Sequence, residues 1–488
     1  MKGLTNRFPA LALAALLIGL NACGGSDSND GVSPPPPLPP PVATTGTVSV
    51  GVITGFGSVY LNGVRYDTSG ASVLMDDQAA VESALKVGQY VELKGHSYGA
   101  EHHADVIRYH NVIEGPIASI DVGASSFVAM GQTVLVTSET SLGDDITPSS
   151  IDGLAVADVV EVSGVVTTGG VIEATRVDIK PDGGPFDVTG YVSKLAPDAK
   201  LFNINALVVD YSGANMEDFT TGQPSEGDLV LVKGFTFDPY VTFVATRVEL
   251  RSDDWLKADA GDELEVEGTI TDFVSATAFK VAGRAVTTTP TTQYEHGTVA
   301  NLANDVLVEV EGTADAAGVL VALKVRFKEV STIRIVAQIE TLVTADGSMK
   351  LLGLVVATNQ ATRYEDKSAL ALRDVNFADL AVGNWVDVRG YEDPAGSNAV
   401  TATRVVRIDP ADGVRLRGPF LDPSRPNFHI LSVLIATNDA TRFVLEESIR
   451  LTSAEFFTQA VDDIVEAWGS WENSTLTAER VEIKVNDD

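Results

Sequence analysis

The sequence predicts a mainly β protein built as a tandem array of six small five-stranded barrels, each with a short helix between strands 3 and 4. Two observations carry this prediction. A strand of alternating apolar and polar residues that ends in glycine recurs six times, and a second short motif follows each copy about ten residues later. Alternation over five residues is typical of a half-buried strand, so each pair of motifs predicts two consecutive strands.

The composition supports a globular protein and argues against one class of partner. The chain has 488 residues, of which 44% are hydrophobic and 21% charged, as in folded domains. Lys and Arg number 34 against 67 Asp and Glu, which gives a net charge of −33. A polyanion of this size repels nucleic acid and anionic bilayer surfaces. We therefore expect no nucleic-acid partner.

The first motif places glycine at the end of an alternating strand, where glycine is typical of a turn or a kink. Successive glycines are 69 to 79 residues apart, which sets the length of the repeated unit. A unit of this size is about the smallest that folds around its own core without disulfides or metal ions. The six copies are Val91–Gly95, Val160–Gly164, Val230–Gly234, Val308–Gly312, Val386–Gly390 and Val465–Gly469.

The second motif reads Ala-Thr-Arg-Val in its commonest form and predicts the returning strand of a hairpin. A basic residue occupies its third position in five of the six units. We expect this residue to serve the fold, covering apolar surface with its stem and pairing with a carboxylate. The copies are Ala104–Ile107, Ala174–Val177, Ala245–Val248, Ala322–Val325, Ala402–Val405 and Ala478–Val481.

Upstream of these strands, each unit opens with a strand and a hairpin, whose tip in the first unit is Asn62-Gly63. Asn and Gly accept the positive φ that a tight hairpin requires. A stretch with helical spacing follows in several units, for example at 81–85 and 447–460. This order of elements is that of an OB-fold, a small partly open Greek-key barrel. The alternative is one extended sheet or solenoid in which no unit closes, although units this long exceed most solenoid repeats.

The motifs also set the expected boundaries. The links between repeats are only a few residues long, so we expect neighbouring repeats to pack on one another. The predicted segments are a lipoprotein signal peptide at 1–22, a lipid anchor with a Gly/Ser/Pro-rich spacer at 23–45, and repeats at 46–112, 113–183, 184–254, 261–330, 331–410 and 411–488.

The N-terminal segment predicts secretion. Its apolar run, Phe8–Leu20, rises about 1.5 Å per residue and is too short for a bilayer core of about 30 Å. A run of this length after a short basic segment is typical of a secretory signal. It ends in Leu20-Asn21-Ala22-Cys23, which resembles the lipobox of bacterial lipoproteins. The alternative is an ordinary signal peptide with an incidental cysteine.

The resemblance to bacterial lipoproteins implies cleavage before Cys23, the only cysteine, and acylation of its side chain. Gly24 follows it, where an aspartate would imply retention at the inner membrane in that family. The resemblance therefore implies the bacterial outer membrane, with the chain facing the periplasm or the cell surface. The proline-rich stretch at 34–41 favours polyproline II and would hold the folded part away from the bilayer.

Taken together, the lipobox, the proline spacer and the repeated Gly-x-Ile, Val-x-Val-x-Gly and Ala-Thr-Arg-Val motifs resemble bacterial lipoproteins that carry the domain of unknown function numbered 5666. The resemblance covers residues 46–486. Later copies drift, since Ala337 replaces the opening glycine of the fifth unit and Ala467 replaces the second valine of the sixth. The family implies a fold and supplies no activity.

Four of the six histidines fall in the first unit, at His96, His102, His103 and His110. Imidazole suits zinc, copper and nickel, so a metal site is one interpretation. His102 and His103 would point to opposite faces of a strand, which leaves His96 to pair with one of them across the hairpin. The other interpretation is a set of polar residues on an exposed hairpin.

The repetition predicts a binding or scaffolding array at the cell envelope, because several similar surfaces gain by multivalency. The expected partners are the membrane, through the lipid anchor, and an envelope protein or glycan that the sequence does not identify. We expect no enzymatic activity and no cofactor. The alternative is a metal-binding or enzymatic function confined to the histidine-bearing first repeat.

Overall fold

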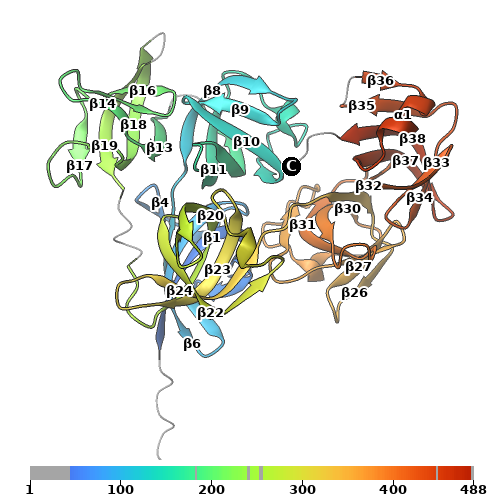
Figure 1. Cartoon of the computed structure of the whole chain (residues 1–488), viewed down its shortest axis with the longest axis horizontal. Coiled ribbons are helices and arrows are strands. Elements are labelled where there is room, and N and C mark those ends of the chain that lie inside the picture. Colours follow the sequence, from blue (N-terminus) through green and yellow to red (C-terminus); the bar gives the residue numbers. More distant parts are fainter. Residues whose placement is uncertain (1–43, 182–183, 239–241, 252–256, 447–448, 485–488) are drawn as a thin grey trace, which may run out of the picture. The chain divides into compact units, whose positions relative to one another are not determined.

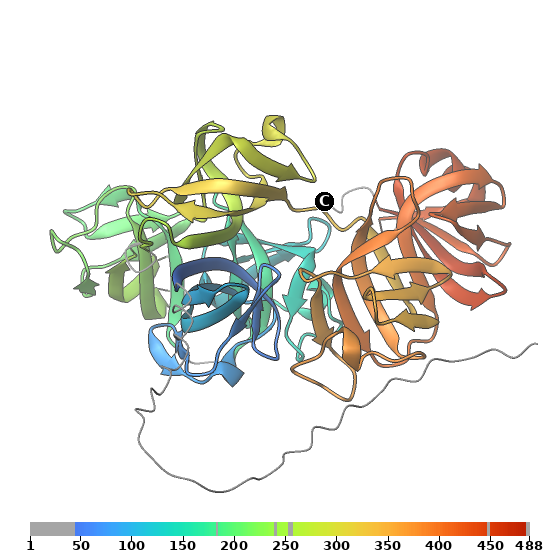
Figure 2. The ribbon, with the colours of Figure 1, turned by 90° about the horizontal axis from the view of Figure 1, so that it is seen from below.

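The structure is a computed structural model that describes residues 44–181, 184–238, 242–251, 257–446 and 449–484. Within these ranges the chain forms 38 strands and one α-helix. Figures 1 and 2 show the strands gathered in successive units along the chain. No helix found there has the length and apolar character needed to cross a membrane. The prediction of a mainly β protein with repeated units is confirmed.

Each unit pairs its strands in the same ring. In unit 1, β1 (Thr45–Gly55) pairs with β2 (Val59–Leu61), and β2 pairs with β3 (Val64–Asp67). The ring continues from β3 to β7 (Glu101–Tyr109) and from β7 to β6 (Tyr90–Tyr98), which pairs with β1 again. Among the five pairings of this ring, only that of β3 with β7 is parallel. The other five units repeat this order, with the first or third strand interrupted in some of them.

The units are not six separate barrels, however, because their strands join into three sheets of 12, 12 and 14 strands. Each sheet holds two units, which are joined through the first strand of each. A strand edge that its own unit leaves open is a template for a further strand. The prediction of six self-contained barrels is therefore wrong in this respect.

Units 1 and 4, which lie far apart in the sequence, share the first sheet. Strand β1 runs parallel to β20 (Glu263–Ser275), with Val48 opposite Leu264. Val48 and its neighbour Val50 thereby extend the core of unit 4. The sequence predicted that neighbouring repeats pack on one another. The pairing of units 1 and 4 shows that distant repeats also pack together. The remaining strands of the first sheet are β4 (Ser72–Met75), β5 (Gln78–Ala80), β21 (Ala278–Val281), β22 (Arg284–Glu295), β23 (Leu307–Ala314) and β24 (Leu320–Phe327).

Units 2 and 3 share the second sheet through β8 (Ile113–Asp121) and β13 (Phe186–Tyr191). The two strands are antiparallel, and one continuous core cluster runs through both units. The remaining strands of this sheet are β9 (Ser126–Ala129), β10 (Gln132–Leu142), β11 (Val159–Val166), β12 (Ile172–Ile179), β14 (Ser193–Ala196), β15 (Leu201–Ile204), β16 (Leu207–Asp210), β17 (Asn215–Glu217), β18 (Leu229–Asp238) and β19 (Thr242–Leu250).

Units 5 and 6 share the third sheet in the same way, through β25 (Ile333–Gln338) and β32 (Val414–Ser424). Their apolar residues also form one continuous core. The remaining strands are β26 (Thr341–Val343), β27 (Ser348–Leu351), β28 (Leu354–Ala357), β29 (Arg363–Asp366), β30 (Trp385–Glu392), β31 (Val400–Ile408), β33 (Asn427–Ile430), β34 (Val433–Ala436), β35 (Arg442–Leu445), β36 (Ile449–Leu451), β37 (Ile464–Glu472) and β38 (Thr475–Lys484).

The glycine that recurs in every unit lies inside a strand rather than at its end. Beside each of these glycines the register with the returning strand shifts, which marks a β-bulge. A Cβ on Gly95 would lie 1.9 Å from the carbonyl oxygen of His103, and the other five glycines are crowded at 1.9–2.5 Å. The glycine is therefore required for a kink, while the predicted end of the strand is wrong.

The second motif is held by two repeated contacts. Thr292 Oγ1 donates a hydrogen bond to the carbonyl of Ala322 over 2.7 Å, and Thr362 makes the same bond to Ala402 over 2.8 Å. Units 2 and 6 repeat this bond. The basic residue of the motif forms an ion pair with a carboxylate in all five units that carry it. This position therefore serves the fold.

The predicted short helix is an α-helix only in unit 6, within the part of the chain that is described. There α1 (Ser453–Gln459) begins after Thr452, which accepts a hydrogen bond from the backbone of Glu455, and Phe456 is buried. In unit 1 the corresponding segment is one 3-10 turn, η1 (Glu82–Ala84), which buries no side chain. A helix this short is not stable without a packed apolar face. The other 3-10 turns are η2 (Ile151–Gly153), η4 (Val299–Asn301) and η5 (Phe377–Asp379).

Candidate ligand-binding cavity

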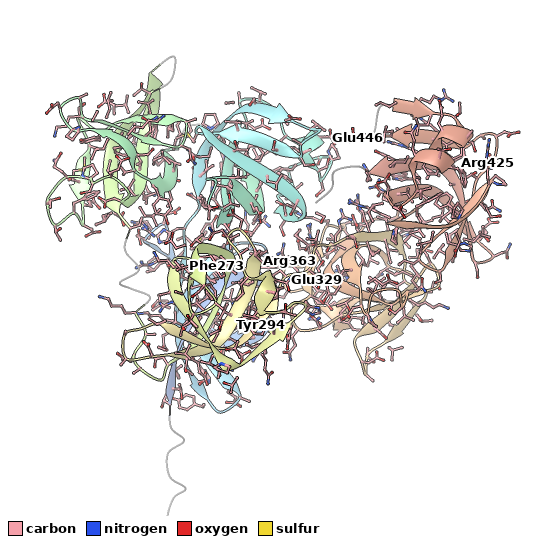
Figure 3. All side chains as sticks on the ribbon, in the orientation of Figure 1. Phe273, Tyr294, Glu329, Arg363, Arg425 and Glu446 are labelled. Carbon is pink, nitrogen blue, oxygen red and sulfur yellow. The ribbon has the colours of Figure 1, made fainter. Side chains whose placement is uncertain are left out.

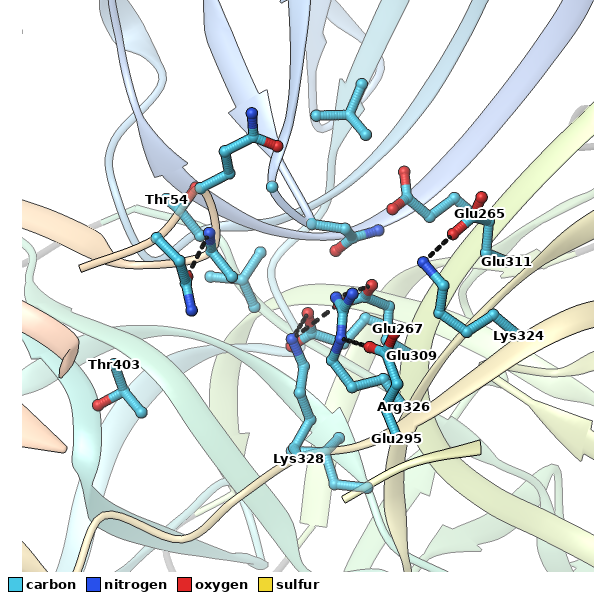
Figure 4. A pocket seen from close by; sticks show the side chains of 18 of the residues that line it. Thr54, Glu265, Glu267, Glu295, Glu309, Glu311, Lys324, Arg326, Lys328 and Thr403 are labelled. Carbon is cyan, nitrogen blue, oxygen red and sulfur yellow. Dashed lines mark hydrogen bonds and ion pairs between the residues drawn. The ribbon is translucent and has the colours of Figure 1, made fainter. Parts of the chain in front are cut away.

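A cavity of 980 Å³ lies against the sheet that units 1 and 4 share, and Figure 4 shows it from close by. Its volume is at the upper end of ordinary ligand pockets, which range over about 300–1,000 Å³. Nine glutamates line it against four lysines and arginines. Unit 2 contributes Glu139 and Glu173, while unit 5 contributes Arg363, which Figure 3 labels together with the lining residue Glu329. The walls are therefore strongly acidic.

Five of the glutamates come from alternate positions of β20 and β23. Leu264 and Val266 point into the core of unit 4, so the residues between them point to the opposite face of the sheet. The antiparallel register places Glu265 directly opposite Glu311. Like charges in such positions destabilise a sheet. The five, called here the glutamate row, are Glu263, Glu265, Glu267, Glu309 and Glu311.

Basic side chains on β24 and just after its end neutralise part of the glutamate row. Lys328 Nζ lies 2.9 Å from Glu267 and 3.1 Å from Glu309, and Arg326 Nη1 lies 2.5 Å from Glu309. Lys324 Nζ lies 2.7 Å from the carboxylate of Glu311 (Figure 4). Burial alone would lower the pKa of Lys328, but the adjacent carboxylates outweigh it and raise that pKa above its ordinary value.

Glu265, in the middle of the row, is not paired directly with any of these basic side chains. Among the described residues, it has no ion pair and no side-chain hydrogen bond. Burial, and then the charges of Glu309 and Glu311, raise the pKa of Glu265 well above its ordinary value. Lys328 and Arg326 offset only part of this effect. The carboxyl group therefore holds a proton more tightly than an exposed glutamate does.

Unit 1 adds buried polar groups to the cavity wall. Thr47 and Asn62 are each 4% exposed, and both line the cavity. Asn62 Nδ2 donates to the carbonyl of Val50 over 3.0 Å. By contrast, Asn62 Oδ1 and Thr47 Oγ1 find no partner in the described part of the chain. A buried polar atom without a partner costs about 1–3 kcal/mol, and both oxygens are covered by the protein in this structure.

The position of Asn62 depends on Gly51. Asn62 and Gly63 have φ of 53° and 86°, so the hairpin tip predicted from these two residues is confirmed. The side chain of Asn62 folds back over β1, where a Cβ on residue 51 would lie 1.9 Å from Asn62 Oδ1. The absence of a side chain on Gly51 therefore makes room for this acceptor.

The four histidines of the predicted metal site do not come together. His96 lies opposite His103, with their rings stacked at a centroid distance of 5.3 Å. His102 points to the other face, edge-on to Tyr66 at 5.5 Å, and lines the cavity. His110 lies away from the other three, with Nε2 3.6 Å from the carboxylate of Asp77.

The stacked pair has carboxylate partners of its own. His96 Nδ1 lies 3.1 Å from Asp105, and His103 Nδ1 lies 3.8 Å from Asp67.

Burial, and then the charge of Arg251, lower the pKa of His110 to about 3. No three His, Cys, Asp or Glu side chains of the described residues are grouped to hold a metal ion. Metal binding by these histidines stays a prediction, and the predicted lipidation site Cys23 lies outside the described residues.

Sequence reasoning missed the glutamate row, although a signal was present. Glu263, Glu265 and Glu267 alternate with apolar residues, which is the pattern of a strand with one charged face. No sequence pattern indicated that this face continues into Thr47 and Asn62, because they lie three repeats earlier in the chain.

Comparison with family models identifies repeated domains in this chain. The family model for a domain of unknown function, DUF5666, matches five segments that together cover more than half of the chain. No curated protein matches. Residues 184–254 lie outside the matched segments, yet their strands pair as in the other units. The matched segments are residues 45–100, 114–178, 267–326, 337–406 and 422–482.

Proposed function

This chain belongs to the DUF5666 family, and we propose that it is a non-catalytic binding protein that holds a cationic ligand in the cavity between units 1 and 4. One observation carries the proposal: Glu265 lies at the centre of a row of glutamates without a basic partner in the described part of the chain. Buried like charges are expensive unless an opposite charge neutralises them. A cationic ligand supplies that charge.

The proposed place of action is the cell envelope of a bacterium. The lipobox-like segment ending in Cys23 supports lipid attachment at the outer membrane, and the proline-rich spacer supports a site held clear of the bilayer. The partners are the membrane, through the anchor, and the cationic ligand. Replacing Cys23 with serine is expected to release the protein from membranes into the soluble fraction.

We also propose that each unit is a modified OB-like barrel. The ring of pairings, with a parallel contact between the third and last strands, supports this assignment. The edge of the first strand then joins two such rings in one sheet. In this arrangement, the array supplies a shared wall for a ligand rather than six equal sites.

Thermal unfolding of the full chain tests the proposed function. Organic cations and matched organic anions are added at constant ionic strength, because the net charge of −33 attracts any cation weakly. A specific ligand stabilises the folded state by mass action, so the melting temperature should rise with cations and not with anions. The variant Glu265→Gln should lose the effect. An equal response to both sets, or none to either, contradicts the proposal.

A further inference from the structure

We infer that the ligand of the cavity is a linear polyamine, an organic cation whose ammonium groups are separated by short methylene chains. This inference rests on the proposed function and names its ligand class. It follows from how the carboxylates are spread, from the buried acceptors beside them, and from the apolar surface between them.

The spacing of the glutamate row suits an extended cation. Glu263, Glu265 and Glu267 occupy alternate positions of β20, which places successive side chains about 6.6 Å apart along the strand. Glu309 and Glu311 lie on the neighbouring strand, about 4.8 Å away. The charges therefore form a band across two strands. Lys324, Arg326 and Lys328 already pair with three of these carboxylates, Glu267, Glu309 and Glu311. Among the described residues, Glu263 and Glu265 form no ion pair, and a ligand with two separated positive charges matches them.

A single metal ion does not match this arrangement of carboxylates. No three acidic or histidine side chains of the described residues are grouped around a common point. Calcium takes six to eight oxygen ligands at about 2.3–2.6 Å, which requires the oxygens to converge. The carboxylates here are held apart by the register of the sheet, and two of them already bind Lys328.

A quaternary ammonium ion does not match the cavity either. Such ions are recognised by aromatic faces that surround them. The aromatic lining residues are Tyr66, Phe327 and Tyr391. Tyr66 and Phe327 are 1% and 7% exposed, and Tyr391 packs against His296. The ligand is thus expected to bind through N–H groups rather than through methylated nitrogen.

The buried acceptors supply partners for those N–H groups. An ammonium group has three donors. Asn62, Thr47 and Glu265 all line the same cavity, and because Asn62 Oδ1 and Thr47 Oγ1 are themselves covered, a bound ammonium group reaches them by rotation of the two side chains. Thr47 lies directly opposite Glu263 and is followed two residues later by Ser49, which lies opposite Glu265. The apolar side chains of Val64 and Leu307 also line the cavity and suit the methylene segments.

Binding is expected to release protons. The groups that face Glu265 are Glu263 on its own strand, Glu309 and Glu311 on β23, Arg326 on β24, Lys328 just after β24, and Tyr66 on β3. Burial and the neighbouring carboxylates favour the protonated carboxyl, whereas a bound ammonium group favours the ionised one. The affinity should therefore increase as the pH rises toward the pKa of Glu265 in the folded protein.

Calorimetric titration of the full chain with spermidine at physiological salt tests the inference. The dissociation constant should increase about tenfold or more in Glu265→Gln, since a hydrogen bond to a charged group is lost. The matched control is Glu479→Gln, which removes an exposed carboxylate from β38 in unit 6. A similar loss in both variants would show attraction by net charge alone and would overturn the inference.

The variant Thr47→Val keeps the test decisive if Glu265→Gln does not fold. The hydroxyl of Thr47 has no partner in the described part of the chain, so a purely structural role predicts no loss of stability and no change in affinity. Weaker spermidine binding with unchanged unfolding supports the inference, and unchanged binding contradicts it.

Comparison ligands separate this inference from the proposed function. Binding of choline or magnesium that depends on Glu265, without binding of spermidine, would overturn the polyamine and leave the cation-binding function standing. Failure of every cation to bind would overturn both.

Discussion

Ser49 of unit 1 lies directly opposite Glu265 of unit 4 in the parallel pair of β1 and β20. On its other side, Ser49 lies opposite Leu93, which belongs to the core of unit 1. The inner face of unit 1 therefore continues across the shared sheet as the glutamate row. On the opposite face of β1, Val48 belongs to the core of unit 4. The two faces of β1 thus belong to two different cores, those of units 1 and 4. The cavity lies on the face of unit 1, where the apolar core ends and the glutamate row begins.

Gly51→Ala should disturb this junction. The new Cβ would lie 1.9 Å from Asn62 Oδ1, so the side chain of Asn62 must move. We expect a loss of about 1–3 kcal/mol in the free energy of unfolding, as for other overpacked interiors. Spermidine binding should weaken as well, because an acceptor is displaced. Chemical denaturation checks the first result.

The control for this variant is Gly55→Ala on the same strand, where the nearest atom to a new Cβ is Tyr60 Cδ2 at 3.8 Å. Its stability should stay within about 1 kcal/mol of the parent. Equal effects of the two substitutions would mean that Asn62 does not occupy the space above Gly51.

Asp187 should make stability increase as the pH falls. This residue of unit 3 is 3% exposed, and burial, opposed in part by Lys233, raises its pKa to about 7. A group with a raised pKa binds its proton more tightly when folded, so the folded state gains stability as the pH falls from above 7 toward 3.8, the ordinary value. Between pH 8 and pH 5.5 the gain is about 2 kcal/mol.

Urea unfolding at these two pH values measures that gain as the difference between the parent and Asp187→Asn. The exposed residue Asp198 supplies the control Asp198→Asn, which should follow the parent at both pH values. A pH dependence identical in the parent and in Asp187→Asn would contradict a raised pKa at this site.

Asp387 should be essential for the stability of the sheet that joins units 5 and 6. It lies 2.7 Å from Arg334 and 2.5 Å from Arg389. Arg389 lies directly opposite both Arg334 and Arg404, so three guanidinium groups occupy neighbouring strands. Burial, and then the charges of Arg334 and Arg404, lower the pKa of Arg389 to about 9 despite the opposing effect of Asp387.

Asp387→Asn removes the carboxylate that Arg334 and Arg389 share. We expect a loss of about 3–5 kcal/mol in the free energy of unfolding, typical of a broken buried ion pair. The exposed Asp412→Asn on the neighbouring loop should change stability by less than about 0.5 kcal/mol. A loss below about 1 kcal/mol for Asp387→Asn would show that solvent already screens this cluster.

Thr452→Ala should destabilise the one α-helix. Thr452 accepts a hydrogen bond from the backbone of Glu455 over 3.2 Å, and its removal should cost about 1 kcal/mol. Thr458→Ala, in the last turn of the same helix, is the matched control. It removes only an exposed hydrogen bond from Thr458 Oγ1 to the carbonyl of Ala454, and its stability should stay within about 0.5 kcal/mol of the parent. Circular dichroism during thermal unfolding measures both, and equal stability of the two variants would exclude a cap at Thr452.

The sequence predicted the parts of the fold that depend on local chemistry. Alternating residues predicted the strands, and Asn62-Gly63 predicted a hairpin tip that requires positive φ. The recurrent glycine predicted a kink, but its cause is a carbonyl on the returning strand, such as that of His103 beside Gly95. That distance depends on the register between two strands, which the glycine does not encode.

The sequence did not predict the pairing of units 1 and 4 or the cavity. The contact of Thr47 with Glu263 joins two repeats that lie far apart along the chain, and either first strand presents an edge that other units also possess. Four histidines in one unit suggested a functional site. The alternating glutamates, by contrast, had the pattern of an ordinary solvent-exposed strand face. A strand face that lines a cavity differs from a solvent-exposed face only in the position of the neighbouring strands.

The central claim is that a cation bound beside Ser49 and Glu265 replaces a proton on the Glu265 carboxyl. Calorimetric titration with spermidine at neutral pH, in two buffers with different ionisation enthalpies, measures the protons released per bound ligand. We predict a net release from the parent protein and none from Glu265→Gln. No release from the parent, or the same release from both proteins, would contradict the claim.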